Sequence, residues 1–273
     1  MKQLKYLNSR GEVIDFRDFD TQILEGNFHT YEWTYDGISR QYGQDIERFR
    51  KDPLKYEIVV AARGEGKENS LNRITEIIEY DIQNKKPAKL WWGDYYLNCF
   101  VISSSTSPSE KFYGAEKTLG VLAPYPFWFR EMHRTFPYVS VAISEEYLDY
   151  PYDYSYDYAG SGDNATWFID HYADSNFEMI IYGPCVDPRI TINGHPYYVY
   201  DTVEKGEYIK VNSEDNTVIK YRTNGTTKDL YDYRGKIEGS LFEKIPSGNL
   251  SIGRNGNFGF DLKLFLERSE PAW

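Results

Sequence analysis

Five tyrosines alternate with other residues in YLDYPYDYSYDYAGSG at 147–162. In an extended chain a period of two places the rings on one side and the intervening aspartates on the other. Rigid aromatic rings of this kind could contact a glycan or another protein, whereas an exposed linker packed on a neighbouring surface is the more ordinary interpretation. The candidate contact residues are Tyr150, Tyr152, Tyr154, Tyr156, Tyr158 and Trp167.

Groups that could bind a metal or act as nucleophiles are few and scattered. No two of the four histidines are spaced for a metal clamp, and aspartates at every fourth position do not match a calcium loop. Cys99 lies in an apolar strand pattern and is expected in the core, while Cys185 has no recognisable base to activate it. His195 follows the turn pair Asn193-Gly194 and is expected to be solvated. We therefore predict no metal, no cofactor and no catalytic residue.

Acidic residues are numerous enough to leave one enzymatic alternative open. Glu145 with Glu146, or Asp229 with Asp232, could act as the acid and base of a glycosidase only at the right separation. Carboxylates of this kind more often lie on a solvated face. A polysaccharide-degrading β-sandwich enzyme is accordingly the third hypothesis.

Length, charge and aromatic content narrow the class of protein. A chain of 273 residues is expected to form about two domains with real cores. The net charge of −11 disfavours a nucleic-acid-binding groove. The sequence has no signal-peptide pattern and no apolar stretch long enough to cross a bilayer, so we expect a soluble, intracellularly made protein. The 17% aromatic content favours a β-rich protein with extensive contact surface.

One amphipathic helix is predicted in the first half of the chain. Leu71, Ile74, Ile78 and Ile82 recur at helical spacing, residue 69 or 70 could cap the start, and 85–87 would end it. The segment APYPFWF at 123–129 has two prolines that impose an extended chain, and we expect the first domain to end there. Strands are predicted in a hairpin over 2–16 that turns at 8–11, and over 56–62, 88–92, 95–104 and 111–122.

After residue 176 the pattern is entirely β. Short runs separated by turn pairs at this spacing are typical of a β-sandwich, so the fold class is mainly β. The predicted strands are 177–183, 189–194, 197–203, 207–212, 217–222, 236–245, 250–253 and 258–268.

Taken in order, these segments resemble the distal tail protein (Dit) family of long-tailed, non-contractile bacteriophages and related prophages. Each segment is short, and their order along the whole chain makes the resemblance specific. The residues that carry it are GEVID at 11–15, the helix followed by strands around 90–102, APYPFWF at 123–129, 177–183, PRITING at 188–194, GEYIKV at 206–211, IPSGN at 245–249 and EPAW at 270–273.

This resemblance implies an N-terminal ring-forming domain, at 1–135, and a C-terminal galectin-like β-sandwich, at 176–273, on either side of a Tyr-rich linker or loop region at 136–175. It implies a homohexameric ring that joins the tail-tube protein to the tail-tip or tail-associated lysin protein. Receptor-binding proteins are further partners in some relatives. The implied location is the tip of the virion tail, after synthesis in the bacterial host cytoplasm.

A ring at that position must let DNA pass without specific binding, and a net charge of −11 suits such a conduit if part of the charge faces the lumen. The alternative from another class is a carbohydrate-binding module that recognises a bacterial surface glycan. Its stacking residues would be the tyrosine row with Trp167, His171 and Trp273.

Overall fold

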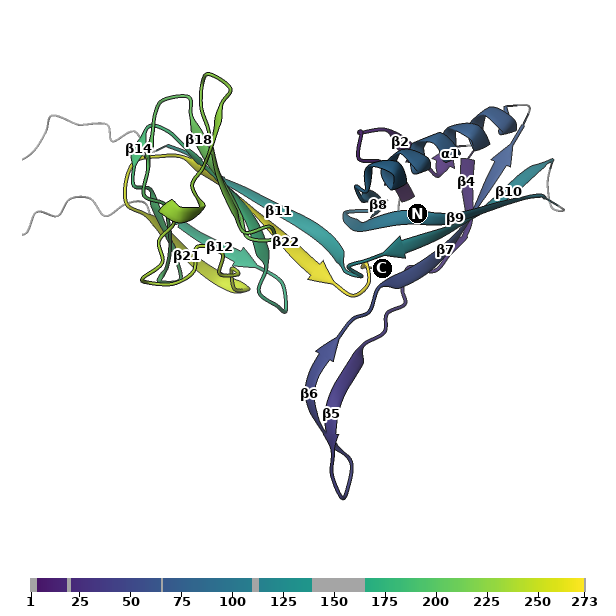
Figure 1. The fold of residues 1–273 in the computed structure, drawn as a ribbon, viewed down its shortest axis with the longest axis horizontal. Helices are drawn as coiled ribbons and strands as arrows, with labels where there is room; N and C mark the ends of the chain where they lie inside the picture. The colour runs from purple at the N-terminus through teal and green to yellow at the C-terminus, as the bar shows by residue number, and fades with distance from the viewer. Residues whose placement is uncertain (1–3, 19–20, 65, 110–112, 139–164, 273) are drawn as a thin grey trace, which may run out of the picture. The chain divides into compact units, whose positions relative to one another are not determined.

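The computed structural model describes residues 4–18, 21–64, 66–109, 113–138 and 165–272 (Figure 1). Across these residues the chain is mainly β with one α-helix, which confirms the predicted fold class. It divides into two compact units, residues 1–130 with 267–273 and residues 131–266. The chain leaves the first unit within β11 (Trp128–Phe136) and returns to it within β22 (Phe260–Arg268), so the second unit is an insertion into the first.

The first unit is an antiparallel assembly whose strands pair in the order β2-β1-β8-β9-β10-β7-β4-β3. The predicted N-terminal hairpin and the predicted strands at 56–62, 88–92 and 95–104 all belong to it. A separate two-stranded hairpin, β5 with β6, pairs only with itself. The bounds are β1 (Leu4–Leu7), β2 (Val13–Asp15), β3 (Arg17–Asp18), β4 (Thr21–Gly26), β5 (Thr34–Ser39), β6 (Gln44–Arg50), β7 (Leu54–Arg63), β8 (Ala88–Trp92), β9 (Tyr95–Pro108) and β10 (Gly114–Ala123).

Helix α1 (Lys67–Asn84) packs against β7, β9 and β10, as the periodicity predicts. The buried stripe differs in detail, because Ile77 joins Ile74 and Ile78 in the core while Leu71 and Ile82 lie at its margin. The helix also begins before the predicted cap at 69–70: its N-cap is Gly66, and no side chain caps it. It ends at Asn84, where Lys85 adopts the left-handed conformation and donates its N–H to the Ile82 carbonyl.

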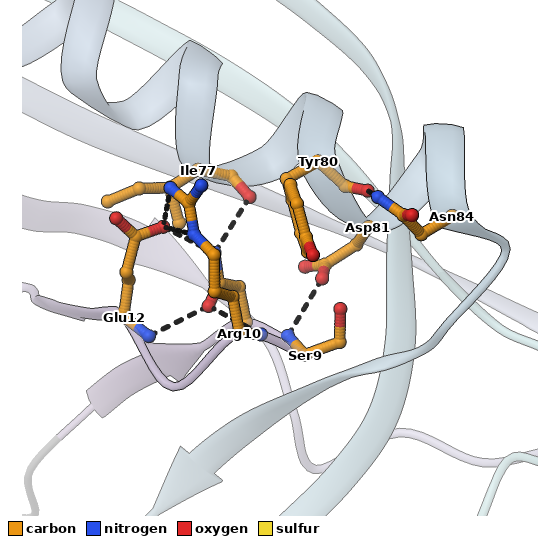
Figure 2. Close-up of polar contacts among 8 residues, drawn as sticks. Ser9, Arg10, Glu12, Ile77, Tyr80, Asp81 and Asn84 are labelled. Atoms are coloured by element: carbon orange, nitrogen blue, oxygen red, sulfur yellow. Dashed lines mark hydrogen bonds and ion pairs between the residues drawn. The ribbon is translucent and has the colours of Figure 1, made fainter.

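A polar network fixes the turn of the N-terminal hairpin to the helix (Figure 2). The fully buried Asp81 carboxylate of α1 accepts a hydrogen bond from the Tyr6 hydroxyl at 2.7 Å and another from the Ser9 N–H at 2.8 Å. Within the turn, the Asn8 side-chain oxygen accepts the Glu12 N–H at 2.8 Å. Gly11 adopts a positive φ of 91° in this turn, while Asn8 contributes through its side chain.

The second unit is a two-layer sandwich around one core. One sheet has the order β20-β19-β18-β13-β22 and the other β12-β21-β15-β16, and buried apolar residues of both sheets form a single cluster. The bounds are β12 (Ala165–Ile169), β13 (Asn176–Tyr182), β14 (Cys185–Val186), β15 (Arg189–Ile192), β16 (His195–Tyr198), β17 (Thr202–Val203), β18 (Tyr208–Asn212), β19 (Thr217–Tyr221), β20 (Thr227–Asp229), the 3-10 helix η1 (Tyr231–Tyr233) and β21 (Gly248–Arg254).

Three details of the second unit differ from the sequence pattern. The predicted strand at 197–203 is interrupted, since β16 ends at Tyr198 and β17 covers only Thr202–Val203. The predicted strand at 236–245 does not form, because Gly239 takes a φ of 143° and only Ile245 makes an isolated bridge, to Ser175. Strand β12 lies within the range 136–175 that was expected to be linker or loop, and it pairs with β21 over all five residues.

A buried ion network closes one side of this sandwich. Lys220, only 6% exposed, places its ammonium 2.9 Å from the Glu207 carboxylate, 3.1 Å from the Asp201 carboxylate and 2.5 Å from the Thr202 carbonyl. Lys228 pairs with the same aspartate at 3.0 Å. All three protons of the Lys220 ammonium therefore have an acceptor.

Candidate self-association surface

The residues expected to make contacts lie mostly outside the described part of the chain. Tyr150, Tyr152, Tyr154, Tyr156 and Tyr158 all fall there, and so does Trp273. Trp167 lies on β12, half-buried against the core of the sandwich. The role of these residues in contacts stays a prediction.

Reactive groups lie in ordinary structural positions. Cys99 is fully buried in the first core, which confirms the expectation from sequence, and burial raises the pKa of its thiol. Burial also raises the pKa of Cys185 to about 11, the opposite of what a nucleophilic thiolate requires. His195 is not simply solvated, since its ring packs on Tyr197 and its Nε2 lies 2.9 Å from the Ser240 carbonyl oxygen.

The two described acidic residues considered as a glycosidase pair also lie in ordinary surface positions. Asp229 is exposed and accepts the N–H of Tyr231, and exposed Asp232 lies 3.7 Å from Lys236. Glu145 and Glu146 fall outside the described residues. Among the residues that the structure describes, no group of three or more His, Cys, Asp or Glu side chains could hold a metal ion, and no helix combines the length and the apolar character needed to cross a membrane.

The feature that sequence reasoning missed is the β5–β6 hairpin, residues 34–50. Figure 1 shows it extending away from the sheet of the first unit as a two-stranded ribbon. A lone hairpin of this kind is only marginally stable in water unless another surface covers it. Every residue of β6 is exposed. The apolar side chains that it leaves in solvent, from 44% to 88% exposed, are Tyr35, Ile38, Tyr42, Ile46 and Phe49.

The register of the hairpin separates an apolar face from a charged one. Tyr35 lies opposite Phe49 on one face. On the other face Asp36 accepts a hydrogen bond from Arg48 at 2.6 Å and lies 3.3 Å from Arg50. The hydrogen bond from Arg48 lowers the pKa of the Asp36 carboxyl. These pairs hold the two strands in register and leave the aromatic face free for a partner.

A β-bulge interrupts the alternation and explains why the hairpin escaped notice in the sequence. Gly37 pairs with Ile46, whereas Asp36 pairs with Arg48, so Glu47 has no partner across the ladder. A side chain at Gly37 would place its Cβ 2.6 Å from the Asp45 carbonyl oxygen, so the bulge requires glycine. The turn itself carries a readable signal in Tyr42-Gly43, where Gly43 has a φ of 81°.

An aromatic cage holds the base of the hairpin. The Lys51 ammonium lies 5.4, 5.0 and 4.3 Å from the ring centres of Tyr31, Trp33 and Phe127, and it donates a hydrogen bond to the Pro126 carbonyl at 3.2 Å. Burial lowers the pKa of Lys51 to about 8. The proline-rich segment 123–129 therefore anchors the hairpin to the first unit.

This arrangement suits binding to another protein. The hairpin has an exposed apolar face, and its charged face is paired within the hairpin. An exposed apolar surface of this kind is typical of a protein–protein contact site. No contact or pKa shift among the residues just described activates a nucleophile or a base.

Comparisons with known proteins agree on the fold. No protein-family model matches the chain, and no curated protein matches it either. Solved structures do. The crystal structure of the phage SPP1 Dit protein, described as a paradigm of the hub adsorption apparatus in phages that infect Gram-positive bacteria, is 10% identical, covers 97% of this chain and 99% of its own, and has a TM-score of 0.62.

A chain of the phage P2 baseplate in its activated conformation with Ca is 15% identical, with a TM-score of 0.66 over 99% of this chain and all of that one. The same baseplate with Sr gives the same values. Nearly all of the chain, in both units, thus shares its fold with these phage proteins.

Proposed function

We propose that this chain is a structural hub protein of a phage tail, whose copies assemble into a six-membered ring through the first unit. One support is the fold, shared along nearly the whole chain with SPP1 Dit and a P2 baseplate protein. The observation that carries the proposal is the β5–β6 hairpin, because its exposed apolar face needs another chain to cover it.

A ring needs a heterologous interface, in which one patch of each subunit contacts a different patch of the next. A protruding element is well suited to be one of the two patches, since it reaches a neighbour without requiring self-complementarity. The aromatic cage around Lys51 holds the base of the hairpin against the first unit before assembly. This contact lowers the conformational entropy that the hairpin loses on binding.

The ring joins the tail-tube protein to the tail-tip or tail-associated lysin protein, at the tip of the virion tail. Receptor-binding proteins are further partners in this proposal. DNA passes through the lumen without specific binding, and the net charge of −11 supports that passage because it disfavours adhesion of the phosphate backbone. The protein acts by holding other proteins together and not as an enzyme.

Mass measurement over a range of protein concentrations tests the proposal. Six copies of the 32.0 kDa chain would give a particle of roughly 190 kDa, with a hole at its centre in negative-stain images. A carbohydrate-binding module, the alternative from sequence, would stay monomeric under the same conditions and bind in a glycan array. A chain that remains monomeric at every concentration, and that no virion contains, contradicts the proposal.

A further inference from the structure

A groove of about 390 Å³ lies in the first unit between α1 and strands β9 and β10. Helix α1 packs against both strands (Figure 1), and Ile78 and Ile82 of the helix give the groove an apolar wall. On the strand side Ile102 also lines it and is 45% exposed, so the groove is open to solvent. A volume of this size is typical of a small-molecule site.

Lys117 of β10 places a buried positive charge in this groove. The residue is only 6% exposed, and its ammonium donates a hydrogen bond to the Thr75 hydroxyl of α1 at 2.9 Å. That hydroxyl donates in turn to the Leu71 carbonyl, so it is a neutral acceptor for Lys117. An ammonium has three donors, and among the described residues the others have no acceptor.

The second charged residue of the groove does not compensate this ammonium. Glu79 of α1 lines the groove, but it is exposed and forms no ion pair with Lys117. A buried charge is costly unless it is both paired and hydrogen-bonded, and desolvation lowers the pKa of Lys117. An anion that entered the groove would therefore gain charge-assisted hydrogen bonds.

The register of β9 and β10 adds a hydroxyl to the same face. Ser104 of β9 pairs with Leu119, and residues 117 and 119 share one face of β10 because side chains alternate along a strand. The Ser104 side chain thus lies on the face of Lys117, is exposed, and lines the groove. Its hydroxyl is a second donor for an anion.

The lining favours one class of anion. Phosphate has several charged oxygens that need many donors, and it gains nothing from isoleucine side chains. A monocarboxylate with a short alkyl chain needs few donors and buries its apolar part against Ile78 and Ile82.

We propose that the groove between α1 and β9–β10 binds a small organic monocarboxylate, whose carboxylate accepts hydrogen bonds from the Lys117 ammonium and the Ser104 hydroxyl and whose alkyl chain packs on the isoleucines of α1. This site goes beyond the proposed function, because it requires neither a second copy nor another tail protein. A ligand that binds only the folded chain also stabilises it.

Calorimetric titration of the full-length chain at constant ionic strength tests the site. Acetate, butanoate and hexanoate should bind with an affinity that rises about fourfold for each CH₂ that the groove buries. Hexan-1-ol and inorganic phosphate should each bind at least roughly 10-fold more weakly than hexanoate. Failure of hexanoate to saturate the chain, or equal binding of hexanoate and the alcohol, would overturn the proposal.

Matched variants show whether the ligand binds at Lys117. Lys117→Met should weaken hexanoate binding roughly 10-fold or more, as expected for a lost hydrogen bond between charged groups. Lys55→Met, at an exposed position of β7 in the same unit, should bind like the parent. Glu79→Gln should bind equally or more tightly, because it removes a like charge from the groove. Weaker binding in Glu79→Gln, or unchanged binding in Lys117→Met, contradicts the assignment.

NMR of the unsubstituted chain keeps the test independent of any folding defect in Lys117→Met. Saturating hexanoate should raise the pKa of Lys117 and shift its side-chain signals, since a bound carboxylate favours the charged form. The signals of Lys55 serve as the internal reference. Lys117 signals that do not respond to hexanoate would overturn the proposal, whether or not the chain assembles into a ring.

Discussion

Lys220 and Lys117 are equally buried, at 6% exposed, and each extends from a strand toward a packed layer. In the second unit Lys220 has three acceptors, two of them carboxylates. In the first unit Lys117 has a single neutral one. Because a buried charge is tolerated only when it is compensated, Lys220 is stabilised by carboxylates of its own unit, whereas no carboxylate pairs with Lys117 among the described residues.

The apolar surfaces differ in the same way. The two sheets of the second unit bury their facing side chains in one core. The first unit has a comparable core but also extends a hairpin whose rings have no core to enter. Exposed rings and a lysine without a paired carboxylate among the described residues thus both lie in the unit through which we propose that the copies assemble.

The largest loss of stability is expected for Lys220→Met, which creates unpaired buried charges in the second unit. It leaves Asp201 and Glu207 without their shared cation, so the free energy of unfolding should fall by about 3 kcal/mol, the low end for a broken buried pair because Lys228 stays beside the aspartate. Urea denaturation of the full chain measures the loss. A change below about 0.5 kcal/mol would mean that the network contributes nothing.

Phe49→Ser tests whether the exposed hairpin of the first unit takes part in assembly. Because the ring is 63% exposed, the unfolding free energy should change by less than about 0.5 kcal/mol. Assembly should weaken roughly 30-fold if the ring is an anchor of the interface. Analytical ultracentrifugation gives the association constant, and Tyr113→Ser, an exposed ring elsewhere in the first unit, is the control. Equal loss in both variants would remove the hairpin from the interface.

Acid should weaken the network around Lys220. The hydrogen bond from Lys220 lowers the pKa of Glu207 below its ordinary 4.5, so the folded chain binds this proton less readily than the unfolded one. Its stabilising contribution is present above pH 4.5 and is lost as the pH falls through the folded-state pKa. Between pH 3 and 6 the unfolding free energy should depend less steeply on pH in Glu207→Gln than in the parent chain. An identical slope in parent and variant would contradict this assignment.

The smallest effect is expected at the hairpin base. Burial lowers the pKa of Lys51 to about 8, against an ordinary value of 10.5, so the folded chain binds fewer protons than the unfolded chain between these values. The contribution of Lys51 to the unfolding free energy should therefore rise with pH across that interval. Lys51→Met should flatten this rise. NMR titration of the Lys51 side chain checks the pKa, and a value near 10.5 would show that the rings offset the burial.

The sequence predicted what periodicity encodes. Helix α1 has isoleucines at helical spacing, and β8 and β13 are apolar runs beside turn signals. The β5–β6 hairpin could not be found this way, because it has no buried face to impose alternation and its bulge shifts the pattern at Gly37. The strand expected at 236–245 failed because Gly239 turns the chain away from the ladder.

The candidate site was harder to predict for a physical reason. Lys117 and Lys220 look alike in sequence, each inside a strand pattern, and only tertiary neighbours decide that one is paired and the other is not. No local signal shows that residues 267–273 return to the first unit. The tyrosine row, by contrast, was conspicuous in sequence and remains a prediction about contacts.

Residues on both sides of 131–266 belong to the first unit. A unit inserted in this way can be replaced as one piece, with both junctions falling inside β11 and β22, while the fold of the first unit is kept.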